Sequence, residues 1–375
     1  MIFVSRTGDG AEIRWRDEKR WLWLLSVASP TVPAIGALLA VWRAEPLWAL
    51  LPVVVYYVFI PLLDTLVGED PANPPEAVVE QLSADGWYRG LLYAAVGVYW
   101  ITFLIVAIVA GAGGLPFWAV LALAIGGGMG AGASINVGHE LGHKGDRAAQ
   151  WGAKLSLAVT GYAHFSIEHN RGHHVEVATP GDAASARFGE SVWRFMLREI
   201  PGALLRGWRL EGERLARKGL PFLHLRNDIL QGYAITFGVT CALTAAFGWI
   251  MLPFLVLHHA QAWFSLTLAN YVEHYGLLRQ KLPNGRYEPC TPRHSWNTNH
   301  IVSNLLLFHL QRHSDHHANP LRPYQALRNF DELPRLPSGY PGSFLLAVVP
   351  PLWFAVMDPK VLAWAGGDMA RVNRG

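Results

Sequence analysis

Six apolar stretches, each about as long as a bilayer-spanning helix, constrain the fold of this chain more than any other feature. A helix needs about 20 mostly apolar residues to cross the hydrocarbon core of a membrane. Of the 375 residues, 51% are hydrophobic and only 16% are charged, as expected for a chain that lies largely in the bilayer. We therefore predict an all-α integral membrane protein with six transmembrane helices, at Trp21 to Trp42, Leu47 to Leu63, Trp87 to Ala110, Pro116 to Asn136, Ile229 to Ile250 and Leu252 to Tyr271.

The connections between these stretches predict that the helices form hairpins. Short turns join the first stretch to the second, the third to the fourth and the fifth to the sixth. Because the helices pair as hairpins, the longer segments emerge from one face of the membrane. These segments carry nearly all of the lysine and arginine, so the positive-inside rule predicts that this face is cytoplasmic. We predict a cytoplasmic N-terminal segment (1–20), four transmembrane helices (21–136), a cytoplasmic segment (137–228), two more transmembrane helices (229–273) and a second long cytoplasmic segment (274–375).

Two further apolar stretches are too short or too interrupted by proline to span a membrane. Trp151 to Phe165 and Ser343 to Met357 are predicted to be helices that lie on the membrane or in the core of the cytoplasmic part. The first twenty residues are polar, so we expect no cleavable signal, and the first apolar stretch should remain in the mature protein.

Charge and cysteine content argue against two classes of function. The formal net charge is only +3, and no basic run alternates with aromatic residues, so nucleic acid is not an expected partner. Cys241 and Cys290 are far apart in sequence and lie outside any C-x-x-C pattern. They predict neither a disulfide framework nor a thiolate metal site.

Nine of the sixteen histidines are grouped at the ends of predicted membrane helices or in the segments that follow, within HELGHK, EHNRGHH, NYVEHYG and LQRHSDHH. Residues three or four apart on a helix share a face, with Cβ atoms about 5–6 Å apart, which is close enough to bind one ion. Nine ligands exceed what one ion uses, so we predict two metal ions. The candidate ligands are His139, His143, His169, His173, His174, His274, His313, His316 and His317.

The spacing predicts which of these histidines act together. His139 pairs with His143, His169 with His173, and His313 with His316 and His317. Imidazole binds zinc, copper, iron and nickel alike, so the spacing predicts a metal site without naming the metal. Each group also contains a carboxylate next to a histidine, suited to accept a hydrogen bond from the ring nitrogen that does not bind metal. These carboxylates are Glu140, Glu168, Glu273 and Asp315.

Two other functions share part of this pattern. HELGH is also the H-E-x-x-H motif of zinc metalloproteases, in which the glutamate is the general base. A membrane protease would need one further ligand and would leave the remaining clusters without a role. A histidine-rich metal transporter is the non-enzyme alternative, but transporter ligands usually lie near the bilayer midplane. The histidines here lie at predicted helix ends and beyond, which disfavours transport.

The remaining seven histidines are predicted to be structural. His258 and His259 precede His274 by about four helical turns, which is more than about 20 Å along the axis. His309 lies one turn before His313 and is expected beside the site rather than in it. Hydrogen-bonded structural roles are expected for His164, His224, His294 and His300.

Motifs outside the histidine clusters carry a family resemblance. They include KRWLW (Lys19 to Trp23), PLLD (Pro61 to Asp64), NPPE (Asn73 to Glu76), REIPGA (Arg198 to Ala203), HSWNTNHIVSN (His294 to Asn304), MDPKV (Met357 to Val361) and WAGGD (Trp364 to Asp368). With them the chain resembles the membrane alkane 1-monooxygenases, within the superfamily of integral-membrane fatty acid desaturases and xylene monooxygenase. NYVEHYGLLRQK, from Asn270 to Lys281, separates this family from desaturases better than the histidine clusters do.

The resemblance implies an activity, a cofactor and partners. It implies a bacterial inner-membrane enzyme that hydroxylates the terminal methyl group of medium-chain alkanes to primary alcohols with dioxygen. It implies that the nine histidines bind two irons, so that the cytoplasmic segments form a helical, histidine-rich di-iron domain. Electrons would come from rubredoxin, which an NADH-dependent rubredoxin reductase reduces. Because this sequence shows no module with paired C-x-x-C motifs, the resemblance implies a separate rubredoxin.

An alkane has no polar group, so it must be recognised by shape in an apolar channel that the bilayer supplies. We expect Tyr56, Tyr57 and Phe59 in the second stretch to line this channel, and Tyr56 to limit the length of the substrate. The glycine-rich stretch from Gly126 to Ala133 either forms a channel wall or packs closely against a neighbouring helix.

A basic segment is a candidate docking site for an acidic rubredoxin. If it is one, charge reversal at Arg214 and Arg217 should raise the KM for rubredoxin. The alternative is a charged helix that faces lipid headgroups. The segment contains Arg206, Arg209, Arg214, Arg217, Lys218 and Arg226.

Overall fold

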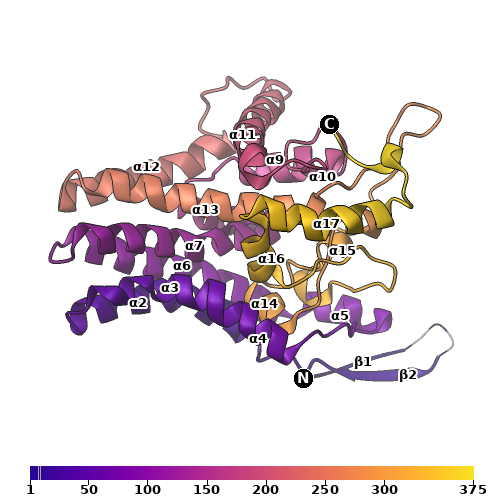
Figure 1. Ribbon diagram of the computed structural model, residues 1–375, viewed down its shortest axis with the longest axis horizontal. Coiled ribbons are helices and arrows are strands. Elements are labelled where there is room, and N and C mark those ends of the chain that lie inside the picture. The colour runs from indigo at the N-terminus through magenta and orange to yellow at the C-terminus, as the bar shows by residue number, and fades with distance from the viewer. Residues whose placement is uncertain (7, 9) are drawn as a thin grey trace.

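A computed structural model of the chain describes residues 1–6, 8 and 10–375. Long antiparallel helices form a bundle at one end of the molecule, and shorter helices and loops form a compact part at the other end (Figure 1). Among these described residues, five helices are long and apolar enough to cross a membrane: Leu24–Trp42, Pro46–Val67, Gly86–Gly111 (α6), Phe117–Gly142 (α7) and Asp228–Phe247 (α12). The predicted class, an all-helical integral membrane protein, is confirmed.

The sixth predicted span is α13, Met251–His274, which has 24 residues and lies beside α7 and α12 in the bundle (Figure 1). It is less apolar than the other five because it carries His258, His259 and Gln261 near its middle and Asn270 and Glu273 near its end. Its last eight residues, from Thr267 to His274, are all buried. The helix that is least hydrophobic is therefore largely enclosed by its neighbours rather than exposed to lipid.

The second span contains a local change of helix type. Its first half is η2 (Pro46–Leu50) and α3 (Leu51–Val54), and its second half is α4 (Ile60–Val67). Between them lies η3, Val55–Phe59, a π-helical turn with one extra residue per turn. Such turns are rare and frequently occur at functional sites. This one contains all three aromatic residues that were predicted to line a channel.

The stretch from Trp151 to Phe165 enters the bundle instead of lying on its surface. The helix α8, Arg147–Ala158, is followed by a non-helical turn. Thr236, eight residues inside α12, donates a hydrogen bond to the carbonyl of Ala158 at 2.9 Å. The indole nitrogen of Trp263 in α13 donates to the carbonyl of Thr160 at 2.8 Å. Neighbouring helices thus satisfy the open backbone groups, as irregular backbone within a membrane bundle requires.

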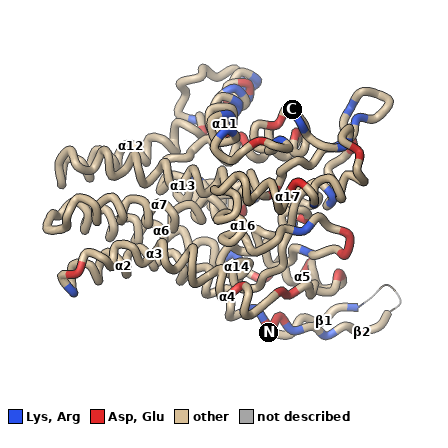
Figure 2. The backbone as a smooth tube through the Cα atoms, in the orientation of Figure 1, with Lys and Arg blue, Asp and Glu red and all other residues tan. Residues whose placement is uncertain are grey.

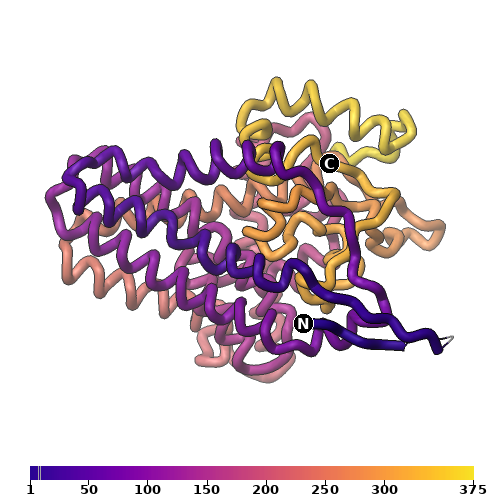
Figure 3. Tube along the Cα trace, turned by 90° about the horizontal axis from the view of Figure 1, so that it is seen from below, coloured from indigo at the N-terminus to yellow at the C-terminus, as the bar shows by residue number. Residues whose placement is uncertain are grey.

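Apart from the bundle, the chain forms a two-stranded hairpin and several short helices. Strands β1 (Ile2–Arg6) and β2 (Glu12–Arg16) pair antiparallel, with Phe3 opposite Trp15. The hairpin lies at the end away from the bundle in both views (Figures 1 and 3). The helices include α5 (Val79–Ala84), α11 (Val192–Ala216), α14 (Ile301–Leu306), α15 (His313–Ala318), α16 (Tyr340–Ala347) and α17 (Pro350–Trp364).

The apolar stretch near the C-terminus, which was not expected to span the membrane as one helix, is bent. The helices α16 and α17 are together apolar enough for a span, but they meet at 116°. Most of the charged residues lie in the part of the molecule away from the tips of the long hairpins (Figure 2). This distribution agrees with a bundle that lies in lipid and a compact part that lies in water.

Candidate metal centre

The candidate metal centre lies where the bundle meets the compact part, because two spans deliver histidines to that end. The helix α7 ends at Gly142, after His139, and α13 ends at His274. A continuous helical segment also lies at this end of the bundle. It consists of α9 (Phe165–Glu168), η5 (His169–His173) and α10 (His174–Glu176). The short helix α15 completes the site with its three histidines.

The structure brings together all nine candidate ligands and divides them into two sets. The ligand atoms within each set lie within 4.8 Å of one another. The five-histidine set consists of His139, His143, His169, His174 and His316. The four-histidine set consists of His173, His274, His313 and His317.

The Nε2 atoms of each set point at one another, as ligands of a common ion do. In the five-histidine set, the Nε2 atoms of His139 and His316 are 2.7 Å apart, and those of His316 and His174 are 3.1 Å apart. In the four-histidine set, the Nε2 of His317 lies 2.9 Å from that of His313 and 3.3 Å from that of His173. Nitrogens bound to one metal at about 2.0–2.1 Å and at right angles lie about 3 Å apart. The residues therefore fit two histidine-bound metal ions.

The division differs from the spacing rule at the second cluster. His139 and His143 share a set, as predicted, and so do His313 and His317. His169 and His173 fall in different sets, because the π-helical turn η5 replaces the α-helix that the rule assumes. The neighbours His173 and His174 therefore face different ions. His316 likewise joins the five-histidine set, apart from the other histidines of α15.

Most of the ligand side chains are held in the neutral form that binds metal, whereas Asp182 raises the pKa of His173 against the effect of burial. Burial, together with the neighbouring imidazoles, holds the pKa of His169, His316 and His317 well below the ordinary value for histidine. Burial also lowers the pKa of His143 to about 4. A histidine must be neutral to ligate a metal, so these rings are prepared for binding at neutral pH.

Three of the four carboxylates that were expected to support the ligands contact other groups. Glu168 forms an ion pair with Arg206, and Asp315 accepts hydrogen bonds from Arg322 and from the backbone N–H of Arg328. Glu140 is buried beside the backbone of Tyr324. Adjacent residues on a helix point about 100° apart, which agrees with these three carboxylates facing other groups than the neighbouring ligand.

Glu273 differs from these three because its carboxylate reaches the site. Its Oε2 lies 3.2 Å from the Nε2 of His313, and its Oε1 accepts a hydrogen bond from the hydroxyl of Tyr340 at 2.7 Å. The contact is with the ring nitrogen that faces the metal, not with the outer one. Glu273 therefore lines the interior of the centre instead of orienting a ligand from outside.

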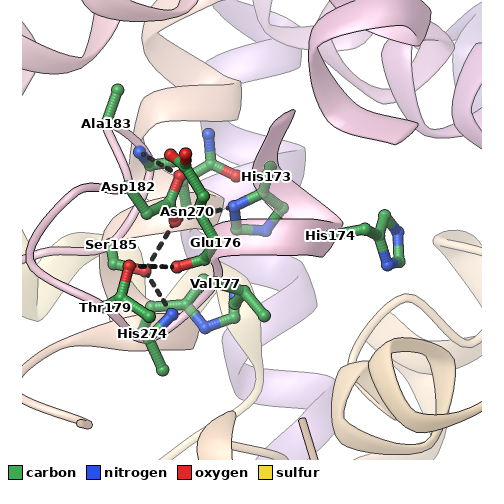
Figure 4. Close-up of polar contacts among 12 residues, drawn as sticks. His173, His174, Glu176, Val177, Thr179, Asp182, Ala183, Ser185, Asn270 and His274 are labelled. Carbon is green, nitrogen blue, oxygen red and sulfur yellow. Dashed lines mark hydrogen bonds and ion pairs between the residues drawn. The ribbon is translucent and has the colours of Figure 1, made fainter. Parts of the chain in front are cut away.

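One carboxylate that contacts a candidate ligand was not predicted from the sequence. Asp182 lies in the loop after α10, and its Oδ2 accepts a hydrogen bond from the Nδ1 of His173 at 2.9 Å (Figure 4). Burial opposes ionisation, but His173 and Arg206 hold the pKa of this carboxyl well below its usual range. No helical spacing connects Asp182 with His173, so only the folded loop reveals the pair.

The other seven histidines lie outside both sets. His164 contacts the hydroxyl of Tyr233 at 2.9 Å, and the Nδ1 of His309 lies 3.0 Å from the carbonyl of Tyr324. His294 contacts Glu288, while His258 is buried against Phe103. These positions agree with the structural roles that were expected.

A cavity of about 130 Å³ connects the centre with the interior of the bundle. Its walls include one or more ligands from each set, namely His139, His169 and His313. Away from the metal centre it reaches Pro30 of the first span and Tyr99 of α6. The wall is mainly apolar, so the cavity suits a hydrocarbon chain with one end at the metals.

The cavity contains two of the three predicted channel residues. Tyr56 and Tyr57 line it, and the hydroxyl of Tyr56 donates to the carbonyl of Ser29 at 3.0 Å. Phe59 does not line the cavity and is 53% exposed on the outside of the bundle. The π-helical turn directs Phe59 outward, so the expectation that it lines the channel is wrong.

The glycine-rich part of α7 serves mainly close packing. A Cβ at Gly128 would lie 2.4 Å from the carbonyl oxygen of His258, and a Cβ at Gly126 would lie 2.9 Å from Pro52. Gly130, Gly132 and Ala133 also line the cavity. The two roles that were considered for this stretch are therefore both present.

Comparison with known proteins agrees with this geometry. The sequence model of the fatty acid desaturase family matches residues 115–343, which include all nine histidines. The fold and site thus define an integral-membrane protein with a histidine-rich metal centre, of the desaturase and hydroxylase superfamily. The chain is 50% identical over 357 residues to alkane 1-monooxygenase 1 of Alcanivorax borkumensis, covering 95% of this chain and 88% of that protein.

A second relative, alkane 1-monooxygenase of Ectopseudomonas oleovorans, is 50% identical over 377 residues. This alignment covers 100% of this chain and 93% of that protein. The hydroxylase component of xylene/toluene monooxygenase from Pseudomonas putida is more distant, with 27% identity over 236 residues, or 62% of this chain and 61% of that protein. The chain belongs to the alkane 1-monooxygenase family, and it is a membrane monooxygenase.

Proposed function

We propose that this protein hydroxylates the terminal methyl group of medium-chain alkanes to primary alcohols at a di-iron centre. The observation that carries the proposal is an apolar cavity that joins the bundle interior to both histidine sets. A chain that enters the cavity from the bundle brings its leading end to the histidines that line the other side. This geometry favours attack at a terminal carbon over attack at a carbon within the chain.

The donor set supports iron as the metal. Five imidazoles converge in one set, whereas structural and catalytic zinc sites usually have four ligands. When bound, two irons supply the activation of dioxygen that no side chain can supply. The chain's own residues contribute position: the histidines hold the ions, and the cavity wall keeps the alkane apart from water.

We also place the protein in the bacterial inner membrane, with the metal centre and the N-terminus in the cytoplasm. The charged end of the molecule and the positive-inside rule support this orientation (Figure 2). In this arrangement the domain layout is the one expected from the sequence, with two cytoplasmic segments, 137–228 and 274–375, that together hold the metals. Lipid delivers the alkane, and the cytoplasm delivers the electrons.

The electron donor in this proposal is a separate rubredoxin, which an NADH-dependent rubredoxin reductase reduces. Two of the six basic residues that were expected to form its docking site are engaged in ion pairs that are wholly or partly buried, whereas Arg217 pairs with Glu213 at 4.0 Å on the exposed surface. Arg206 is buried against Glu168 and Asp182, and Arg214 pairs with Glu211 and Asp228. The others, Arg209, Arg217, Lys218 and Arg226, are exposed.

A different edge of the protein lies directly beside the metal-binding histidines. His143 and His174 are half-buried, whereas the other seven ligands are buried. The exposed Arg171 and the half-buried Lys144 flank this edge, and neither forms an ion pair with the described residues. Val175, 63% exposed, adds an apolar contact. This edge combines access to a ligand with uncompensated positive charge, so it is our proposed docking site for an acidic rubredoxin.

Charge reversal distinguishes the two surfaces. The pair of changes Lys144→Glu and Arg171→Glu is expected to raise the KM for rubredoxin by about tenfold at low salt, because electrostatic steering is lost. The matched control is Arg217→Glu with Lys218→Glu at the end of α11. Steady-state kinetics at two salt concentrations, with metal content checked, measure both. A larger effect of the α11 pair would contradict the proposed docking site.

Metal analysis combined with product analysis tests the proposed function. The purified protein should contain two iron atoms per chain and convert octane to 1-octanol when rubredoxin and its reductase are supplied. Stoichiometric zinc without iron, together with the absence of alcohol, would contradict the proposal and favour the protease alternative.

A further inference from the structure

One of the nine ligands is supported differently from the rest. His173 is 1% exposed, and its outer ring nitrogen, Nδ1, meets the carboxylate of Asp182. Because an ionised carboxylate only accepts hydrogen bonds, the Nδ1 of His173 carries the proton and donates it. This leaves the Nε2 of His173 free to bind metal. Among the described residues no other ligand has a carboxylate at its outer nitrogen, and the Nδ1 atoms of His139, His313, His316 and His317 have no partner.

Asp182 is itself fixed through both of its oxygens. Its Oδ2 also accepts a hydrogen bond from the hydroxyl of Ser185 at 2.7 Å (Figure 4). Its Oδ1 accepts from Arg206 at 2.7 Å and from the backbone N–H of Ala184 at 3.2 Å. With 1% of its surface exposed, the carboxylate has no room to rotate. It therefore sets the plane of the His173 ring.

Arg206 connects this pair to the whole second cluster. Its guanidinium bonds to Glu168 before the π-helical turn, to Glu176 after it, and to Asp182 in the following loop. The guanidinium also packs against Gly172, where a Cβ would lie 2.6 Å from its Nε. Glycine is thus required between His173 and Arg171 so that Arg206 can reach all three carboxylates.

We propose that Asp182, held by Arg206 and Ser185, is the positioning residue for the metal of the four-histidine set. It fixes the orientation and the tautomer of His173, and so it controls how tightly that one ion is bound. The metal of the five-histidine set does not depend on it, because none of its ligands has such a partner. The inference rests on the two-metal centre in the proposed function.

Selective loss of one metal ion tests this proposal. The variant Asp182→Asn keeps the shape of the side chain but removes its charge. We expect purified Asp182→Asn, reconstituted with iron(II), to lose one of its two ions to a chelator at least about tenfold faster than the unmodified protein, because removing such a partner typically weakens metal binding by about 10–100-fold. The Mössbauer spectrum of the variant should change in one iron component and keep the other.

Glu199→Gln is the matched control. Glu199 is also a buried carboxylate, but it accepts hydrogen bonds from Thr267 and Asn270 and contacts no imidazole. It should retain both ions as the unmodified protein does. Equal loss of both ions from Asp182→Asn, or retention of both, would overturn the proposal.

A milder variant keeps the test decisive if Asp182→Asn does not fold. Ser185→Ala removes one hydrogen bond to Asp182, together with the one that Ser185 accepts from the backbone N–H of Ala178, and leaves the carboxylate in place. It should show the same selective loss with a smaller rate increase, and loss equal to that of the unmodified protein would contradict the proposal.

All of these experiments measure metal occupancy and iron spectra, and none of them measures hydroxylation. Selective loss from a protein that made no alcohol would therefore contradict the proposed reaction and still support the role of Asp182.

Discussion

The substitution His317→Ala is expected to reduce the metal content from two ions to about one per chain and to reduce hydroxylation of octane to background. His317 occupies the middle of the four-histidine set, with its Nε2 close to those of both His313 and His173. Its loss leaves three ligands, whereas the five-histidine set keeps all of its own. Metal analysis of the purified variant and gas chromatography of the products measure the two effects.

The matched control for this substitution is His224→Ala. His224 belongs to neither set and contacts the backbone N–H of Arg226. This variant should keep both metal ions and its activity. If His317→Ala also kept both ions and continued to produce alcohol, the assignment of the four-histidine set as a metal site would be wrong.

The second large effect is expected from Tyr56→Ala. Tyr56 lines the cavity deep in the bundle and is held there by its hydrogen bond to Ser29. Removing the ring lengthens the space for a chain whose end lies at the metals, so the products should shift to longer alkanes. Incubating whole cells with a mixture of n-alkanes of graded length measures the shift.

Two neighbouring variants make the Tyr56 test specific. Phe59→Ala removes an aromatic ring from the same π-helical turn but on the outer face, so its profile of chain lengths should be unchanged. Tyr56→Phe keeps the ring and removes only the hydroxyl, so it should resemble the unmodified protein. An unchanged profile for Tyr56→Ala, or an equal shift for Phe59→Ala, would show that Tyr56 does not limit chain length.

The membrane bundle and the ligand candidates can be predicted from the sequence because both depend on local patterns. Runs of about 20 apolar residues define spans wherever they occur. Histidines three or four apart on a helix meet regardless of the rest of the fold, which explains why His139 and His143 fall together. His274 was also predictable, since its group ends a span at the same face as the other clusters.

The division of the histidines into two sets could not be predicted from spacing. The division depends on the π-helical turn at His169–His173, and no residue pattern in the sequence predicts this turn. The support of His173 by Asp182 depends on the loop after α10, which Arg206 holds in place through a hydrogen bond to Asp182. Arg206 belongs to α11, which follows this loop in the sequence. The path of α8 into the bundle depends on Thr236 and Trp263, which satisfy its open carbonyls from other helices. Each of these features is a tertiary contact.

We expect the end of an alkane chain that lies in the bundle cavity to be oxidised by dioxygen at the metal centre that the two histidine sets would hold. The most direct measurement is the product formed from octane by the purified, iron-loaded protein with rubredoxin, its reductase and dioxygen enriched in the heavy oxygen isotope. We expect 1-octanol as the main alcohol, with its oxygen derived from dioxygen. Alcohols with the hydroxyl inside the chain, or oxygen derived from water, would contradict this expectation.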